Sequence, residues 1–281
     1  MNKHFNNINK IQAFILKSCL ALLVSWTFVS CEEESLIKER DWQLVWEDNF
    51  DGAAGQSPDS TKWTYDIGTD WGNQQLEFDT DRPENVSTDG NGNLAIISRR
   101  ESFAGSAFTS ARITTQGLFE QAYGRFEARI KMPWGPGIWP AFWLLGADID
   151  VVGWPLCGEI DIMEYRGQEP NIIHGSVHGP GYSGGAAVTK SFAFPDDRFD
   201  KDFHIFAIEW GENFIHYFVD DNLYLELTPE DLPGNWVYDH PFYIILNVAV
   251  GGNYVGFPTE DTPFPQTMLV DYVRVYKERA S

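Results

Sequence analysis

The sequence of 281 residues predicts an all-β protein, a sandwich of two sheets packed face to face. Three observations carry this prediction. A dozen or so short segments are rich in β-branched and aromatic residues, which favour extended chain. Glycine, asparagine and aspartate separate them, as tight turns require. Helical periodicity is nearly absent, so each sheet must bury its apolar face against another sheet.

The first 40 residues differ from the rest. Three lysines precede or interrupt an apolar run, and residues 18–30 carry no charge, as in a secretory signal. The run is too short to span a bilayer. Residues 28–31, F-V-S-C, resemble a bacterial lipobox with Phe in place of the usual Leu. We expect residues 1–30 to be a lipoprotein-type signal peptide and Cys31 to be the acylated start of an acidic tether, residues 31–40. Ordinary cleavage nearby and free secretion is the alternative.

Residues 41–278 are expected to form one domain, since no repeat or long linker divides them. Strands are predicted, in chain order, at 42–46, 94–99, 109–114, 126–132, 141–145, 159–165, 172–178, 188–194, 203–210, 214–219, 223–227, 242–250 and 269–276. A helical turn is predicted near 59–63, with Ser57 as its cap, and a second one at 228–231. Residues 71–82 are polar and aromatic and are expected to form a loop.

Charge and cysteine content limit the function. Removing residues 1–30 leaves 17 Lys and Arg against 41 Asp and Glu, a net charge near −24. Such a surface repels nucleic acid and polyanionic polysaccharides, whereas a neutral glucan is unaffected. Only Cys31 and Cys157 remain, so acylation of Cys31 leaves no intrachain disulfide. Cys157 is expected to be a small buried hydrophobe.

Three carboxylates fall within six residues of the predicted strand 159–165, in the sequence G-E-I-D-I-M-E-Y-R. In a regular strand Glu159 and Asp161 share a face and Glu164 points into the core, which is unfavourable for an unpaired charge. A β-bulge at or near Met163 would return Glu164 to the face of the other two. Retaining glycosidases need two carboxyl groups roughly 5–5.5 Å apart. The alternative is an acidic edge strand that merely faces water.

The order E-I-D-I-M-E, between W-P-L-C-G and Y-R-G, resembles the signature of glycoside hydrolase family 16. The stretches T-S-A-R-I-T-T-Q-G, W-P-A-F-W and P-F-Y-I-I-L-N-V-A-V-G-G-N are similar to those of its bacterial endo-β-1,3-glucanases. The spacing of two residues between Asp161 and Glu164 resembles laminarinases, agarases and carrageenases, whereas lichenases and xyloglucan transglycosylases have one. The resemblance implies a jelly roll of two curved antiparallel sheets, with the catalytic strand in the concave one.

The resemblance also implies roles for the carboxylates. Glu159 would be the nucleophile, and Glu164 the general acid and later the base. Three carboxylates this close cannot all ionise readily, so at least one proton is held to higher pH than usual. Asp161 would share a proton with Glu159 and orient it.

Tryptophans are the expected substrate contacts, because sugar rings stack on aromatic side chains. Ten of the eleven tryptophans follow residue 30. Trp139 and Trp143 are four residues apart, on one strand face, in a stretch that the family places beside the cleaved bond. Trp154 is a further candidate, and Trp134 is expected to be only a turn residue. A core position is the alternative for each.

Polar substrate contacts are expected from two further stretches. The family places His178 near the nucleophile end of the cleft, and His174 lies four residues earlier on the same face. Zinc is the rival interpretation of this pair, but no third ligand stands at metal spacing. Asn73, Glu77 and Arg82 match a W-G-N-x-x-L loop that in laminarinases binds sugar hydroxyls in the minus subsites.

A structural Ca²⁺ site is the last expectation from the resemblance. Its ligands would be Glu47, the backbone carbonyl of Gly92 and Asp271, on the convex face. Hard oxygen ligands of this kind suit Ca²⁺. The alternative is that these are ordinary surface groups. No cofactor is expected for catalysis.

The sequence therefore predicts an exported, retaining endo-hydrolase of β-1,3-glucans such as laminarin, with mixed β-1,3/1,4-glucans left open. Its binding partner would be the polysaccharide and not nucleic acid. The protein would be a monomer that contacts the membrane only through Cys31 and faces the periplasm or the cell surface. Agarase, carrageenase or lichenase-like hydrolysis and transglycosylation are alternatives within the family. A non-catalytic glucan-binding jelly roll is the alternative outside it.

Overall fold

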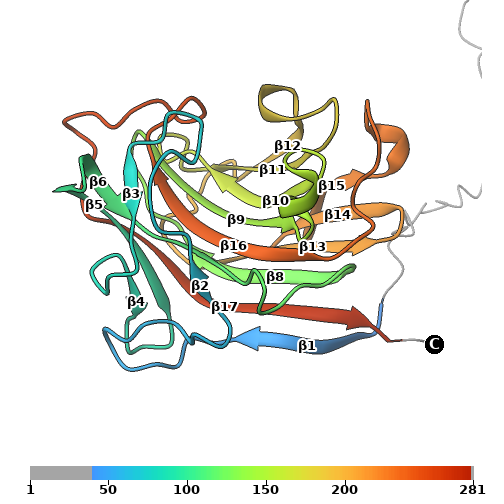
Figure 1. Cartoon of the computed structure of the whole chain (residues 1–281), viewed down its shortest axis with the longest axis horizontal. Helices are drawn as coiled ribbons and strands as arrows, with labels where there is room; N and C mark the ends of the chain where they lie inside the picture. Colours follow the sequence, from blue (N-terminus) through green and yellow to red (C-terminus); the bar gives the residue numbers. More distant parts are fainter. Residues whose placement is uncertain (1–39, 280–281) are drawn as a thin grey trace, which may run out of the picture. The chain divides into compact units, whose positions relative to one another are not determined.

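Residues 40–279, described here from a computed structural model, fold into two sheets that pack face to face (Figure 1). This confirms the predicted β-sandwich. The predicted signal peptide and Cys31 lie outside the described residues. Within the described part, no helix is long and apolar enough to cross a membrane.

The larger sheet has ten strands. In spatial order its strands are β15 (Asn222–Leu227), β14 (Phe214–Val219), β13 (His204–Gly211), β8 (Gly124–Lys131), β17 (Gln266–Glu278), β5 (Leu94–Phe103), β6 (Ser106–Ser110) and β3 (Glu77–Asp79), with β1 (Trp42–Asp48) paired to β17 and β4 (Val86–Thr88) paired to β5. All of these pairs are antiparallel except β3 with β6.

The smaller sheet has seven strands and carries the three carboxylates. Its spatial order is β12 (Val188–Ala193), β11 (Ile172–His178), β10 (Glu159–Tyr165), β9 (Ile138–Gly146), β16 (Phe242–Val250), β7 (Arg112–Thr114) and β2 (Thr64–Tyr65). Its long strands β9 and β16 are visibly curved (Figure 1). Strand β10 therefore lies inside the sheet, with β11 on one side and β9 on the other.

The core fills the space between the sheets. Alternate residues of β8, Phe126, Ala128 and Ile130, are fully buried, as the period of two predicts. Ile160 from β10 and Ile244 from β16 are buried in the same cluster. Because apolar side chains of β10 enter this core, its polar side chains are left for the opposite face.

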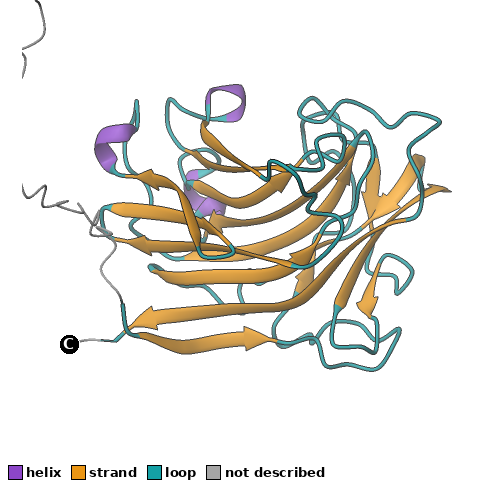
Figure 2. Ribbon diagram, turned by 180° about the vertical axis from the view of Figure 1, so that it is seen from behind, coloured by secondary structure: helices purple, strands orange, loops and turns teal. Residues whose placement is uncertain are grey.

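Within residues 40–279, helical structure is confined to three short segments, α1 (Ile149–Val152), η1 (Gly184–Ala186) and η2 (Pro229–Asp231), which lie in loops between strands (Figure 2). The predicted turn at 228–231 is confirmed as η2, with a capping box between Thr228 and Asp231. Residues 59–63 form a single turn in which Trp63 N donates to Asp59 O. Asp59 caps it by accepting from Thr61 N, so the prediction of Ser57 as the cap is wrong.

Two predicted segments differ from the structure. Residues 109–114 were expected to form one strand, but the chain crosses between sheets at the buried residue Ala111, from β6 to β7. The sequence F-T-S-A-R-I-T-T contains no glycine, proline, asparagine or aspartate to mark the crossing. The expected loop 71–82 contains the short strand β3, which pairs in parallel with β6. Neither feature has a local signal, because both depend on pairing with distant strands.

Candidate active site

Strand β10 contains the predicted bulge. Asp161 is opposite Ser176 of β11 and Glu164 is opposite His174, so three steps along β10 match two along β11. On the other side, the register with β9 shifts between Asp161 and Met163. The extra residue sends Met163 into the core, where it is fully buried. The β-bulge at or near Met163 is thereby confirmed, and Glu164 is free to share the face of Glu159 and Asp161.

The three carboxyl groups act on one another electrostatically. Burial raises the pKa of Glu159 to about 8, and the charge of Asp161 adds to this. Burial also raises the pKa of Glu164 to about 8, followed by the charge of Asp161, and Glu159 contributes less. Burial raises the pKa of Asp161 to about 7, against a hydrogen bond with Glu159 that lowers it. This cluster therefore holds protons near neutral pH, as a general acid must.

Two tryptophans each donate an indole N–H to one of the glutamates. Trp154 Nε1 lies 2.9 Å from Glu159 Oε2, and Trp139 Nε1 lies 3.0 Å from Glu164 Oε1. Trp139 belongs to β9, whereas Trp154 lies in the loop between α1 and β10 and is 48% exposed. Both therefore stand beside the carboxylates, and Trp154 leaves about half its surface to solvent.

His178 faces the nucleophile end of the same cluster. Its Nε2 lies 3.0 Å from Asp161 Oδ2 and 3.6 Å from Glu159 Oε1. Its Nδ1 accepts a hydrogen bond from Gly184 N at 3.0 Å. Because Nδ1 accepts, a neutral ring carries its proton on Nε2, directed at the two carboxyl groups.

His174 does not share a site with His178. It lies opposite Glu164, at the other end of β10, and its Nδ1 is 2.8 Å from Ser191 Oγ. Its Nε2 lies 3.7 Å from Glu169. The two histidines thus contact different groups, which disfavours a zinc site built on the pair.

Trp143 is half-buried and belongs to a cluster that the sequence analysis did not predict. Its Nε1 donates to Asn247 Oδ1 of β16 at 2.8 Å. The Arg112 guanidinium lies between two indoles, 4.8 Å from the Trp143 ring and 5.0 Å from the Trp71 ring, and pairs with Asp66 at 2.8 Å. Arg112 is within the stretch T-S-A-R-I-T-T-Q-G, but its place beside Trp143 depends on β7 and β9 flanking β16.

The loop predicted to bind sugar hydroxyls divides into two parts. Asn73 is exposed, and its backbone oxygen accepts from Asn253 N at 2.7 Å, which joins this loop to the one after β16. Glu77 is only 1% exposed, and its Oε2 accepts from Val250 N at 2.8 Å. Burial raises the pKa of Glu77 to about 7. A side chain so buried offers no surface to a sugar, so the structure contradicts direct substrate contact by Glu77; it anchors the loop to β16.

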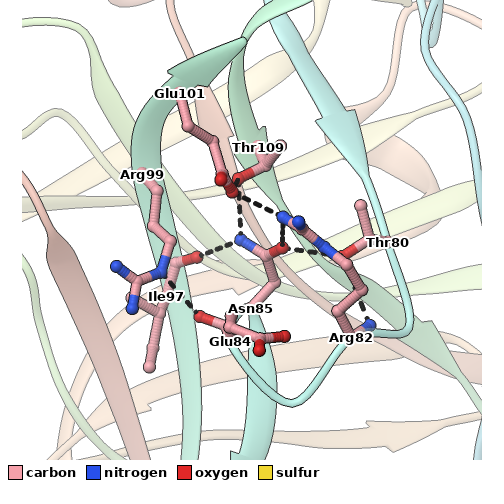
Figure 3. Close-up of polar contacts among 8 residues, drawn as sticks. All are labelled: Thr80, Arg82, Glu84, Asn85, Ile97, Arg99, Glu101 and Thr109. Atoms are coloured by element: carbon pink, nitrogen blue, oxygen red, sulfur yellow. Dashed lines mark hydrogen bonds and ion pairs between the residues drawn. The ribbon is translucent and has the colours of Figure 1, made fainter. Parts of the chain in front are cut away.

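Arg82 lies in a polar cluster between β4, β5 and β6 (Figure 3). Its guanidinium donates to Asn85 Oδ1 at 2.7 Å, pairs with Glu101 and lies 4.5 Å over the Phe103 ring. Thr109 Oγ1 also donates to Glu101. The contacts in the structure therefore bind Arg82 to its own sheet, and contact with substrate stays a prediction.

Both acids expected to bind Ca²⁺ are paired with arginines in the structure. The Glu47 carboxylate pairs with Arg274 at 3.3 Å and faces it across the β1–β17 register. The Asp271 carboxylate pairs with Arg129 at 2.6 Å. Each acid is paired with an arginine through one of its oxygens, so a hard cation would compete with two guanidinium groups. The calcium site stays a prediction that chelation can test.

The fold and the site together define a carbohydrate-active β-sandwich hydrolase. The half-buried Glu159 and the buried Glu164 flank an aspartate on one face of a curved sheet, with indole rings beside them, as expected of a retaining glycosidase. The profile of Glycosyl hydrolases family 16 matches residues 61–274. The chain belongs to this family.

The chain is similar to known glucan hydrolases. A "Beta-glucanase" from Rhodothermus marinus is 41% identical over 272 residues, which cover 92% of each chain. The laminarinase catalytic domain from Thermotoga maritima is 47% identical with a TM-score of 0.80, covering 85% of this chain and 100% of that one. The endo-β-1,3-glucanase from Pyrococcus furiosus is 44% identical with a TM-score of 0.81, covering 86% and 97%.

Proposed function

We propose that this protein is a retaining endo-hydrolase of β-1,3-glucans of the laminarin type. The observation that carries the proposal is the bulge in β10, which gives Glu159 and Glu164 a common face around Asp161. The names of two similar proteins, a laminarinase and an endo-β-1,3-glucanase, support β-1,3-glucan as the substrate class. Mixed β-1,3/1,4-glucans are a second candidate substrate, to be separated by assay.

The reaction follows as a double displacement. Glu159 attacks the anomeric carbon while Glu164 transfers its proton to the departing glycosidic oxygen, which leaves as an alcohol. A water molecule then attacks the covalent glycosyl ester, its proton passes to Glu164, and Glu159 leaves as a carboxylate. The proton balance closes, since Glu164 regains in the second step what it lost in the first.

The mechanism needs a charged Glu159 and a protonated Glu164, that is, one proton for the two glutamates. Burial keeps the proton on Glu164 near neutral pH, where the acid is needed. Burial and the charge of Asp161 raise the pKa of Glu159 to about 8 as well, while His178 and the Trp154 N–H favour its charged form. His178 and the Trp139 N–H act in the same way on Glu164, so the two roles follow the order of the residues in the motif and not their pKa values. Asp161 lies between them, within reach of His178 Nε2, and can hold the shared proton of the cluster.

A reducing-sugar assay on laminarin, lichenan, agarose, carrageenan and xyloglucan tests the proposal. The wild type should release reducing ends fastest from laminarin, with a rapid fall in chain length as endo cleavage requires. Glu159→Gln and Glu164→Gln should each lose several orders of magnitude in rate while keeping the wild-type circular dichroism spectrum. A preference for agarose or carrageenan, or near wild-type turnover in either variant, would overturn it.

We further propose that the protein is exported, anchored through Cys31 and monomeric. The lipobox-like residues 28–31 and the uncharged run before them support the anchor. Labelling with a radioactive fatty acid should mark the wild type and not Cys31→Ser, which should be released from the membrane fraction. Equal labelling of both proteins would contradict the anchor.

A further inference from the structure

Trp139, the donor to Glu164, is covered on one side by the loop that follows β16. The Tyr254 ring packs against it, with ring centroids 4.9 Å apart and planes tilted by 39°. A Cβ placed on Gly252 would lie 3.7 Å from Trp139 Cζ3, so the loop backbone also approaches the indole. Trp139 itself is half-buried. Its indole plane is therefore fixed from behind by this loop.

Tyr254 is in turn held from its other sides. The Arg166 guanidinium lies 4.3 Å from the centre of its ring, and the His174 ring meets it edge-on at 5.9 Å. Arg166 is tied to Glu169 at 3.4 Å. The loop is joined to the Asn73 loop by the Asn253 N–H. Tyr254 is thus a fixed support rather than a mobile side chain.

We propose that Tyr254 is a positioning residue for the acid/base Glu164 and acts through Trp139. The inference rests on the proposed function, since it gives Glu164 a catalytic task. The Tyr254 hydroxyl oxygen is buried, so it does not meet a sugar in the cleft. The ring makes the contacts with Trp139 and Arg166, and the ring carries the effect.

The physical argument concerns one hydrogen bond. The Trp139 N–H reaches Glu164 Oε1 at 3.0 Å only in one orientation of the indole. Without Tyr254 the indole can turn toward the space left behind it, and the bond weakens or is lost. That bond favours the charged form of Glu164, so its loss raises the pKa of Glu164. It also leaves the carboxyl group less well oriented toward the glycosidic oxygen.

Kinetics of Tyr254→Ala, with Tyr254→Phe and Phe257→Ala as controls, test the inference. Hydrogen bonds to charged groups contribute about 1.5–3 kcal/mol, so Tyr254→Ala should lower kcat by about tenfold or more. The alkaline limb of its pH profile should move to higher pH, because that limb reports loss of the Glu164 proton. Tyr254→Phe keeps the ring and should match the wild type. Phe257, an exposed aromatic of the same loop, should be dispensable.

A double-mutant cycle with Trp139→Phe separates positioning from a general loss of stability. Trp139→Phe keeps a ring but removes the N–H, so it should itself shift the alkaline limb upward. In that background Tyr254→Ala should add no further shift, since the bond is already absent. An additive shift would overturn the inference. If Tyr254→Ala does not fold, Tyr254→Leu enters the same cycle.

The outcomes distinguish this inference from the proposed function. A wild type that cleaves no glucan would refute the proposed function. An active wild type, together with a folded Tyr254→Ala that keeps both kcat and the alkaline limb, would refute only the role of Tyr254.

Discussion

Replacing the proposed nucleophile Glu159 by glutamine is expected to stabilise the protein while it abolishes activity. Burial and the charge of Asp161 raise the pKa of Glu159 from 4.5 to about 8. A carboxyl group with a higher pKa in the folded state binds its proton more tightly there than in the unfolded chain. Its contribution to stability is complete below about pH 4.5 and is lost as the pH rises through about 8. An amide has no such proton to lose.

The pKa values of Glu159 in the unfolded and folded states, 4.5 and about 8, set the size of the stabilisation. A pH of 7.5 is about three units above the pKa of Glu159 in the unfolded chain. At about 1.4 kcal/mol per unit, the ionisable Glu159 therefore lowers the free energy of unfolding by about 4 kcal/mol at this pH. At pH 5 the same difference is below about 1 kcal/mol. Because Glu159, Asp161 and Glu164 titrate together, the larger figure is an upper limit. The stabilisation by Glu159→Gln should therefore grow steadily between these two pH values.

Thermal unfolding of wild type and Glu159→Gln between pH 5 and 8 is the assay. At about 2–4 °C per kcal/mol, the variant should melt up to about 16 °C higher at pH 7.5 and nearly with the wild type at pH 5. Glu212→Gln, at an exposed turn, is the matched control and should change little at either pH. A melting temperature equal to or below that of the wild type at pH 7.5 would refute the reasoning.

Three further changes have definite expected results. Trp154→Phe removes a hydrogen-bond donor that favours the charged form of Glu159, so the acidic limb of the pH profile should move upward by about one pH unit or less. The control Trp134→Phe should leave this limb in place. An unmoved limb in Trp154→Phe would contradict the hydrogen bond between Trp154 and Glu159. Arg112→Met loses contacts with two indoles and the Asp66 pair, so the melting temperature should fall by about 2–6 °C, and no fall would show that this cluster is not stabilising. A chelator should lower the melting temperature if Ca²⁺ binds at Glu47 and Asp271, and an unchanged melting temperature would remove the calcium prediction and leave both acids paired with arginines alone.

The bulge was predictable from the sequence because it resolves a local conflict. A regular strand would bury Glu164 beside Ile160 and Ile162, and the alternation of side chains alone exposes that problem. The same alternation placed Trp139 and Trp143 on one face. These features depend only on residues close together in the chain.

Features that depend on contacts between distant strands could not be predicted from the sequence. Glu77 is buried because β3 joins β6 in parallel and its carboxylate meets the Val250 N–H, neither of which a polar loop sequence indicates. Arg112 reaches Trp143 only because the chain changes sheets at Ala111. The helix α1, which precedes Trp154, is four residues long and has no detectable periodicity. Contacts made across strands decide each of these positions.

The stereochemistry of the first product tests the central claim most directly. If Glu159 and Glu164 face each other across the bond in a double displacement, proton NMR of laminarin hydrolysis should detect the β-anomer before mutarotation. Initial appearance of the α-anomer would mean a single displacement by water and would contradict the roles assigned to both glutamates.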